Sequence, residues 1–148
     1  MIQILTKEHI ADIADLDQLC FPVGSFPEDV ITPMFNMDGF VALGQYEGEQ
    51  LICCLLGHSI FDEGELWSIA THPNHRGKGL AQAIFKQFED SVKTKGVERL
   101  FWEVRVSNTG AQRFYDKLGA ECFGERKGFY TSEDNSPAED ALLYRYQF

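Results

Sequence analysis

Two spacings of apolar residues alternate along the chain and predict its helices and strands. Apolar residues that return every three or four positions predict helices over 10–20, 27–36, 80–95 and 111–118. Thr6 and Pro27 favour a helix start, and Gly96 and Gly119 favour a helix end. Short apolar runs between turn residues predict strands over 1–5, 40–46, 51–61, 66–71, 100–106, 120–126 and 141–147.

The order of these elements predicts an α/β fold of the α+β kind. The strands up to residue 71 follow one another through short turns, which is typical of an antiparallel meander. Residues 66–105 run strand, helix, strand, and that order implies one right-handed parallel crossover. We therefore predict a mixed, mostly antiparallel sheet of six to seven strands with about four helices, and a polar linker over 131–139.

Length and charge narrow the classes of protein further. The 148 residues suit a single domain, 1–148, and a hydrophobic fraction of 44% is ordinary for a folded protein. The net charge of −10 is uneven, because residues 1–64 carry eleven acidic residues and one basic residue, whereas residues 65–148 carry twelve of each. An acidic surface repels nucleic acids and anionic membranes and attracts cationic partners. Solubility alone and attraction of a cationic partner both remain open as explanations.

Neither the apolar runs nor the cysteines indicate a membrane span or a metal site. No apolar run reaches the about 20 residues that span a bilayer, and the N-terminus lacks the pattern of a signal peptide. Cys20, Cys53, Cys54 and Cys122 have no zinc-motif or redox-motif spacing, and Cys53 and Cys54 lie in an apolar run typical of a core. We expect no bound metal and a reducing, cytoplasmic location.

A glycine-rich stretch, His75-Arg76-Gly77-Lys78-Gly79-Leu80-Ala81, lies between a predicted strand and a predicted helix. Its glycines let backbone N–H groups approach a ligand closely, and the helix start favours an anion. Two phosphate-binding motifs do not match, because a P-loop needs Ser or Thr after the lysine and a dinucleotide fingerprint needs glycine in place of Gln82. An anion site and a turn without a ligand remain the alternatives.

Four motifs in this half of the chain resemble those of the GNAT superfamily of N-acetyltransferases. Residues 76–81 resemble its signature R/Q-x-x-G-x-G/A, and the strand before them, 66–73, resembles L-x-x-I-A-V-x-P. Two further blocks resemble L-E-V-R-x-S-N … A-x-x-L-Y-x-x-L-G-F, at 101–108 and 114–119, and G-x-R-x-x-Y-Y … E-D-A-L, at 124–130 and 139–142. The ordered series, over about residues 64–145, is most similar to that of the RimI-type ribosomal-protein alanine N-acetyltransferases.

The resemblance implies a GNAT fold and acetyl transfer from acetyl-coenzyme A to a primary amine in a ternary complex, without a metal. For the RimI type, the amine would be the N-terminal α-amino group of a ribosomal protein. This sequence departs from the pattern at two positions. Gly119-Ala120 stands in place of Gly-Phe, and Phe129 replaces the first tyrosine of the Tyr-Tyr pair, which removes one hydroxyl from the acceptor side.

Direct acetyl transfer needs a base for the amine proton and an acid for the leaving thiolate. Glu103 is the candidate base, and we expect burial between Trp102 and Val104 to raise its pKa toward neutrality. Pairing with Arg105 and exposure through strand alternation are the structural alternatives. Tyr115 is the candidate acid, because a phenol can donate to a thiolate and the resemblance implies a tyrosine facing the coenzyme sulfur. The alternative for Tyr115 is simple core packing.

The resemblance also implies which residues would bind the two substrates. The backbone that would hold the pyrophosphate belongs to Arg76, Gly77, Lys78, Gly79, Leu80 and Ala81. The main chain that would lie beside the pantetheine arm belongs to Ile69, Ala70 and Thr71. Asn108, which its position also predicts as a helix cap, would hydrogen-bond the same arm. On the acceptor side, Tyr130, Phe129 and Glu28 are the candidate substrate contacts.

Three functions of different classes fit these residues. The first is N-terminal acetylation of a ribosomal protein, and the second is acetylation of a small cationic amine such as a polyamine or an aminoglycoside. The acidic half of the chain suits either acceptor, so charge does not separate them. The third is a non-catalytic module that binds coenzyme A, and the presence of both Glu103 and Tyr115 argues against it. We expect a monomer or a homodimer that binds neither nucleic acid nor membrane.

Overall fold

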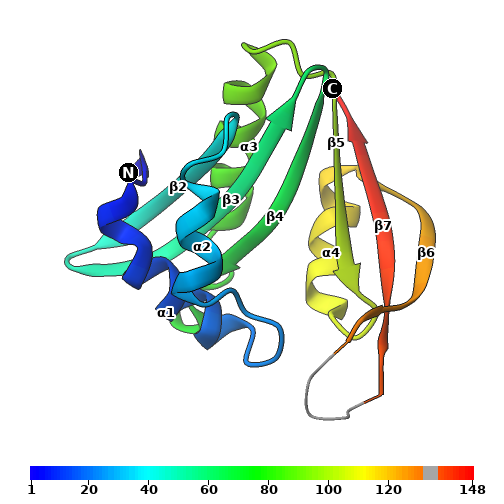
Figure 1. Cartoon of the computed structure of the whole chain (residues 1–148), viewed down its shortest axis with the longest axis horizontal. Coiled ribbons are helices and arrows are strands. Elements are labelled where there is room, and N and C mark those ends of the chain that lie inside the picture. The colour runs from blue at the N-terminus through cyan, green and yellow to red at the C-terminus, as the bar shows by residue number, and fades with distance from the viewer. Residues whose placement is uncertain (132–136) are drawn as a thin grey trace.

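Figure 1 presents the computed structural model of the chain, which describes residues 1–131 and 137–148. Most of the predicted linker at 131–139 therefore lies outside the described residues. The strands are β1 (Ile2–Ile4), β2 (Phe40–Glu47), β3 (Gln50–Ile60), β4 (Glu63–Thr71), β5 (Arg99–Arg105), β6 (Glu121–Tyr130) and β7 (Glu139–Gln147). The helices are α1 (Ile10–Cys20), α2 (Glu28–Met34), α3 (Leu80–Lys93) and α4 (Thr109–Leu118), with short 3-10 turns η1 (Lys7–His9) and η2 (Pro73–His75).

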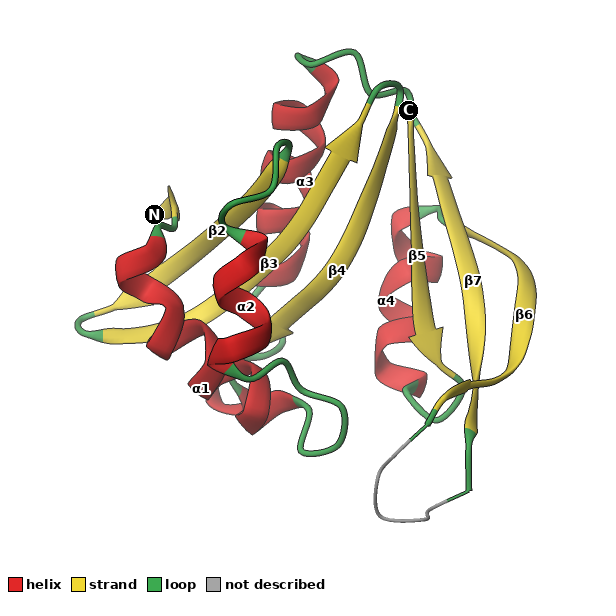
Figure 2. Cartoon of the chain, viewed as in Figure 1, coloured by secondary structure: helices red, strands yellow, loops and turns green. Residues whose placement is uncertain are grey.

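The seven strands form one sheet in the order β1-β2-β3-β4-β5-β7-β6. Every neighbouring pair is antiparallel except β4 and β5, which run parallel and are connected through α3. Helices α1 and α2 cover one face of the sheet, and α3 and α4 cover the other (Figure 2). These observations confirm the predicted fold class, with its mostly antiparallel sheet, four helices and single parallel crossover.

The long apolar run of β3 is explained by helices on both faces of the sheet. Leu55 belongs to the core cluster beneath α3 and α4, and its neighbour Leu56 belongs to the cluster beneath α1 and α2. Successive side chains of a strand point to opposite faces, so a strand that is covered on both sides is apolar throughout. Cys53 and Cys54 are buried for the same reason, as the sequence predicted.

The sheet opens between its two parallel strands. β4 and β5 pair only where Glu63–Glu65 meets Arg99–Phe101, and beyond these residues the two strands diverge (Figure 1). Trp67 forms a bulge in β4, opposite Leu56 and Gly57, just past this point. The sheet therefore has two parts, β1–β4 with α3 and β5–β7 with α4, and the backbones of β4 and β5 form a V, called the wedge below, that widens toward the end of β4.

Several element boundaries differ from the prediction by a few residues, and the structure explains the differences at Thr6, at Pro27 and at the end of β6. Thr6 precedes η1 rather than α1, and its N–H donates to His9 Nδ1 at 2.9 Å, so a 3-10 turn comes before the α-helix. Pro27 is the residue before α2 and not its first helical residue. β6 extends four residues beyond the predicted end, because the Gly128 N–H donates to Asp140 at 2.8 Å and Tyr130 pairs again with β7.

Candidate active site

The predicted anion-binding loop connects β4 to α3 at the open end of the wedge. Gly77 and Gly79 have φ angles of +77° and +78°, in the left-handed region that favours glycine. Apart from the adjoining residues of the chain, no heavy atom of the described residues lies within 4 Å of the position that a Cβ would take at either glycine, so both border open space. The Ala83 N–H makes a helical hydrogen bond to Gly79 O at 3.1 Å. The N–H groups of residues 80–82 in the first turn are therefore available to an anion.

The start of this loop is held by side chains that bind main-chain groups. Arg76 Nε donates to Thr71 O at 3.0 Å, and Cys20 Sγ donates to the same oxygen at 3.3 Å. His72 Nδ1 accepts a hydrogen bond from Asn74 N–H at 3.1 Å. Because the Arg76 guanidinium already binds the Thr71 carbonyl, the cofactor role predicted for residues 76–81 depends on their backbone. The Lys78 side chain is exposed.

Ile69, Ala70 and Thr71 lie on the part of β4 beyond the point where the sheet opens. They pair with β3 on one side, at Leu55, Cys54 and Cys53, and the described ladder gives them no strand partner on the other. The free edge of a strand offers N–H and C=O groups to an extended ligand. The three residues thus lie between the narrow end of the wedge and the glycine loop, where an extended arm could pass.

Glu103 is exposed, and this corrects the expectation of a buried base. Trp102 and Val104 are buried beneath α3 and α4, and alternation along β5 directs Glu103 to the opposite face. Of the two structural alternatives for Glu103, the structure shows exposure through strand alternation. The Glu103 carboxylate contributes to raising the pKa of the Tyr130 phenol, after the larger effect of burial, so it lies among the acceptor-side candidates.

Tyr115 of α4 is buried in an aromatic cluster. Its ring centroid lies 4.8 Å from that of Trp102 and 5.5 Å from that of Tyr144. Burial, with smaller effects of Tyr130 and Tyr144, raises the pKa of this phenol well above its usual range. Core packing and an acid role are compatible here, because a phenol with a raised pKa keeps its proton at neutral pH.

Asn108 is the N-cap of α4, as its position in the sequence predicted. Its Oδ1 accepts a hydrogen bond from Ala111 N–H at 3.1 Å. Asn108 comes three residues after the end of β5, and its N–H donates to Arg105 O at 2.9 Å. Gln112 Nε2 binds the carbonyls of Arg105 and Val106 at 3.3 and 2.8 Å. Because the cap uses the Asn108 oxygen, its amide nitrogen remains the group that could bind a ligand arm.

Arg105 connects three segments around Tyr130, and sequence reasoning gave it no role in the site. Its guanidinium lies 4.2 Å from the centre of the Tyr130 ring and forms an ion pair of 3.1 Å with Glu139. A Cβ at Gly24, in the loop between α1 and α2, would lie 2.3 Å from Arg105 Nη2, so this loop passes directly against the guanidinium. Burial is the largest cause that raises the pKa of Tyr130, to about 12.

The other two acceptor-side candidates lie at the surface. Phe129 is 42% exposed, and its ring contacts the Tyr130 ring edge-on at 5.0 Å and the Arg126 guanidinium at 5.4 Å. Glu28 is exposed in the first turn of α2, next to Asp29, where carboxylates also favour the helix dipole. A substrate role for both residues therefore stays a prediction.

Asp17 is a second residue that the sequence did not single out. It is 4% exposed, and its carboxylate accepts hydrogen bonds from Phe26 N–H at 2.7 Å and from Ser68 Oγ at 2.8 Å. Burial raises its pKa, although both hydrogen bonds act in the opposite direction. Asp17 thus holds the loop between α1 and α2 against β4 at Ser68, the residue before Ile69.

Neither a metal site nor a membrane span is found in the described part of the chain. Within residues 1–131 and 137–148, no three His, Cys, Asp or Glu side chains are grouped so that they could hold a metal ion. No helix in these ranges is long and apolar enough to cross a bilayer. The four cysteines are free thiols.

Comparisons with known proteins agree with this geometry. The sequence profile described as the Acetyltransferase (GNAT) family matches residues 10–120. A ribosomal protein bS18-alanine N-acetyltransferase of Haemophilus ducreyi is 27% identical over 147 residues, which cover 99% of each chain. A relative from Bacillus subtilis is 40% identical over 84 residues, 57% of this chain, and the match spans about half (53%) of its own length. The crystal structure of the ribosomal-protein-S18-alanine N-acetyltransferase from Escherichia coli superposes with a TM-score of 0.87 at 22% identity, covering 99% of this chain and 92% of that one.

Proposed function

Because this chain belongs to the acetyltransferase (GNAT) family, we propose that it transfers acetyl from acetyl-coenzyme A to the N-terminal α-amino group of a protein. The observation that carries the proposal is the opening between β4 and β5 that leads to the glycine loop. A free strand edge beside an anion-binding loop matches a ligand with an amide-bearing arm and a pyrophosphate. The names of the bS18-alanine N-acetyltransferase relatives support a ribosomal protein as the acceptor.

The residues of the wedge fit acetyl-coenzyme A. The backbone N–H groups of residues 76–81 would hold the pyrophosphate, because the Cβ positions of Gly77 and Gly79 border open space that a phosphate can occupy. The main chain of residues 69–71 would bind the pantetheine arm, together with the Asn108 amide. The coenzyme supplies the acetyl group as a thioester, and this chain supplies the groups that position it and move protons.

Tyr115 and Glu103 have separate tasks in the proposed transfer. The amine nitrogen forms a bond to the acetyl carbon as the carbon–sulfur bond breaks, and the departing sulfur takes the proton of the Tyr115 hydroxyl. The proton of the amine passes to the Glu103 carboxylate, directly or through a water molecule. An α-amino group has a pKa of about 7.7–8.0, against about 10.4 for lysine, so a larger fraction of a protein N-terminus is already the neutral nucleophile near pH 7.

The acceptor side combines a narrow aromatic contact with an acidic surface. Tyr130, held by Arg105, would contact the first residue of the acceptor, while Phe129 and Glu28 lie further out. Because residues 1–64 carry all of the net charge of −10, we propose a cationic acceptor, as the termini of ribosomal proteins are. We further propose that the chain acts as one cytoplasmic acetyltransferase domain, as a monomer or a homodimer.

A peptide panel with acetyl-coenzyme A tests this function through the rate of thiol release. Basic peptides that begin with Ala should react faster than the same peptides with a blocked N-terminus, and faster than free polyamines or aminoglycosides. Changing Glu28→Gln together with Asp29→Asn should raise KM for basic peptides more than for neutral ones. If a small cationic amine reacts faster than every peptide, the proposal of a protein acceptor is wrong and the small amine is the preferred substrate. Equal KM changes for basic and neutral peptides would indicate that the acidic surface serves solubility and does not select the substrate.

A further inference from the structure

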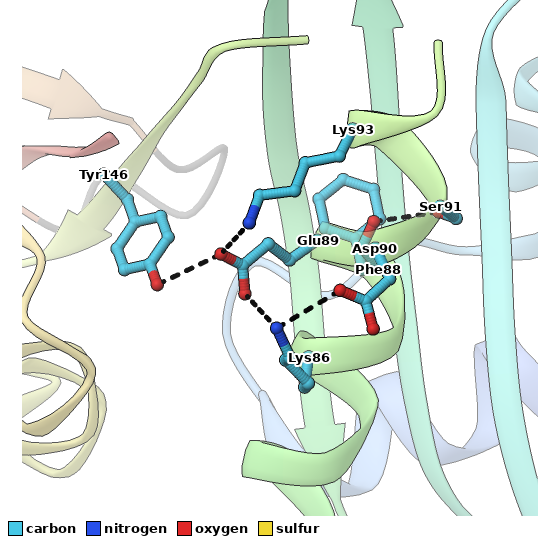
Figure 3. Close-up of polar contacts among 7 residues, drawn as sticks. All are labelled: Lys86, Phe88, Glu89, Asp90, Ser91, Lys93 and Tyr146. Carbon is cyan, nitrogen blue, oxygen red and sulfur yellow. Dashed lines mark hydrogen bonds and ion pairs between the residues drawn. The ribbon is translucent and has the colours of Figure 1, made fainter. Parts of the chain in front are cut away.

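A buried carboxylate between α3 and β7 has no task in the proposed reaction. Glu89 of α3 is 6% exposed and accepts a hydrogen bond from the Tyr146 hydroxyl of β7 at 3.3 Å (Figure 3). Lys86 and Lys93 form ion pairs with it at 3.6 and 3.4 Å, and both lysines are on α3 as well. Burial of a carboxylate is costly, and an apolar side chain of similar size would often be at least as stable. The presence of the acid therefore needs a reason beyond stability.

The hydrogen bond between Glu89 and Tyr146 joins the two parts of the sheet. α3 starts at the glycine loop and packs on β3 and β4, whereas β7 pairs with β5, the strand of Glu103. The β4–β5 ladder that connects the two parts is only three residue pairs long. Phe85 of α3 adds an apolar contact, with its ring edge-on to Tyr146 at 5.4 Å. Tyr146 pairs with Leu100 of that ladder, so the bond lies at the narrow end of the wedge, on the side of α3 and α4.

The same residues border a cavity next to the glycine loop. This cavity, of about 520 Å³, lies between α3 and α4, and its lining includes Gly79, Phe85, Glu89, Lys117 and Tyr146. It therefore extends from the end of the glycine loop to the Glu89–Tyr146 hydrogen bond. A change in the separation of α3 and β7 would widen or narrow the space beside the proposed pyrophosphate site.

We propose that Glu89 and Tyr146 are positioning residues that hold the two sides of the acetyl-coenzyme A site at the separation required for binding. The inference rests on the proposed function, because that function places the coenzyme in the wedge. Without the hydrogen bond, the free protein populates conformations in which α3 and β7 lie further apart. Coenzyme binding then has to bring them together again, which lowers the apparent affinity for the coenzyme. Bound coenzyme itself bridges the two parts, so the rate of transfer in the complete complex depends little on the bond.

Calorimetric titration of the full chain with coenzyme A tests this role directly. Tyr146→Phe removes the hydroxyl and keeps the ring on Phe85, and we expect Kd to rise about three- to tenfold, the range for loss of one hydrogen bond. The kcat at saturating acetyl-coenzyme A should stay within about twofold. Ser91→Ala is the matched control, because it also removes one hydroxyl and its hydrogen bond, from Ser91 Oγ to Phe88 O at 2.8 Å, within α3 alone (Figure 3). Its Kd should equal that of the wild type.

A double-mutant cycle and the melting temperature complete the test. If the two residues act through one bond, Glu89→Met should add little further loss of coenzyme affinity in the Tyr146→Phe background. Additive losses would overturn the proposal, and so would a lower Tm in Tyr146→Phe without a change in Kd, which would make the bond structural only. Absence of coenzyme A binding by the wild-type chain would refute the proposed function itself, whereas binding that Tyr146→Phe leaves unchanged refutes this inference alone.

Discussion

The Tyr115 phenol allows the proposed chemistry to be tested separately from the fold. Tyr115→Phe removes the hydroxyl and leaves the ring in contact with Trp102, at 4.8 Å between centroids, and with Tyr144. In the described residues, burial and neighbouring phenols account for the raised pKa of Tyr115, with no hydrogen bond among the causes. The substitution should therefore change the free energy of unfolding by less than about 1 kcal/mol.

The expected effect on catalysis is much larger. A side chain that transfers a proton in the transition state contributes about 10²–10⁴-fold to the rate, which corresponds to about 2.7–5.5 kcal/mol. Tyr115→Phe should lower kcat by this factor, because the thiolate has to leave without its proton donor. KM for acetyl-coenzyme A should change by less than about threefold, since the hydroxyl acts on the reacting sulfur and not on the bound coenzyme as a whole.

Tyr144→Phe is the matched control for this substitution. It removes a hydroxyl from the same aromatic cluster, on a strand that carries no proposed catalytic group. Thiol release at saturating substrates should give a kcat within about threefold of the wild type for Tyr144→Phe, and thermal unfolding should be measured for both variants. A kcat for Tyr115→Phe within about fivefold of the wild type, or equal losses in both variants, would remove Tyr115 from the mechanism.

Three further predictions concern pH, the loop between α1 and α2, and the glycine loop. Burial raises the pKa of Tyr115 above its usual value of about 10, so the phenol keeps its proton up to that pH, and ionisation of this group should not lower kcat at any pH below about 10. A loss of kcat near pH 8 that is absent in Tyr115→Phe would contradict this. Gly24→Ala places a Cβ 2.3 Å from Arg105 Nη2 at a φ of +84°, and should raise the acceptor-peptide KM at least about fivefold while the Kd of coenzyme A stays constant. Gly77→Ala adds a methyl group to the open space of the loop at a φ of +77°, so calorimetry should find coenzyme A binding weakened about tenfold, and unaltered binding would exclude the loop backbone as a ligand site.

The fold could largely be predicted because its signals are local. The apolar face of α3 returns every four residues, and Gly119 ends α4 with a φ of +88°, in the left-handed region that favours glycine. Even the double-sided burial of β3 is visible as an unbroken apolar run. The predicted end of β6 was wrong because its extension depends on the distant Asp140 carboxylate, a partner that the local pattern does not contain.

The parts of the site that the sequence missed are long-range contacts of charged residues. Asp17 lies 51 residues from Ser68 and could have been noticed only because it shares a helix face with the buried Ile13. Arg105 is in the motif that includes Glu103, yet its partners, Gly24 and Glu139, come from both ends of the chain. The burial expected for Glu103 was wrong because apolar neighbours on a strand indicate that the residue between them faces the other way.

The acidic first half of the chain divides into charges that the fold uses and charges that remain for a partner. Asp12 accepts a hydrogen bond from the Tyr46 hydroxyl at 2.6 Å, Asp17 holds the loop between α1 and α2, and Asp62 binds Arg99 at 2.7 Å, so these carboxylates act within the protein. Glu28 and Asp29 are instead exposed directly after the loop that contacts Arg105. An ion pair such as that of Asp62 with Arg99 leaves little net field for another cation, whereas an exposed carboxylate outside such a pair still attracts a cationic substrate. The net charge alone therefore overstates the attraction, and we expect selection of a basic acceptor at the exposed pair at the start of α2, because this pair follows the loop that contacts Arg105.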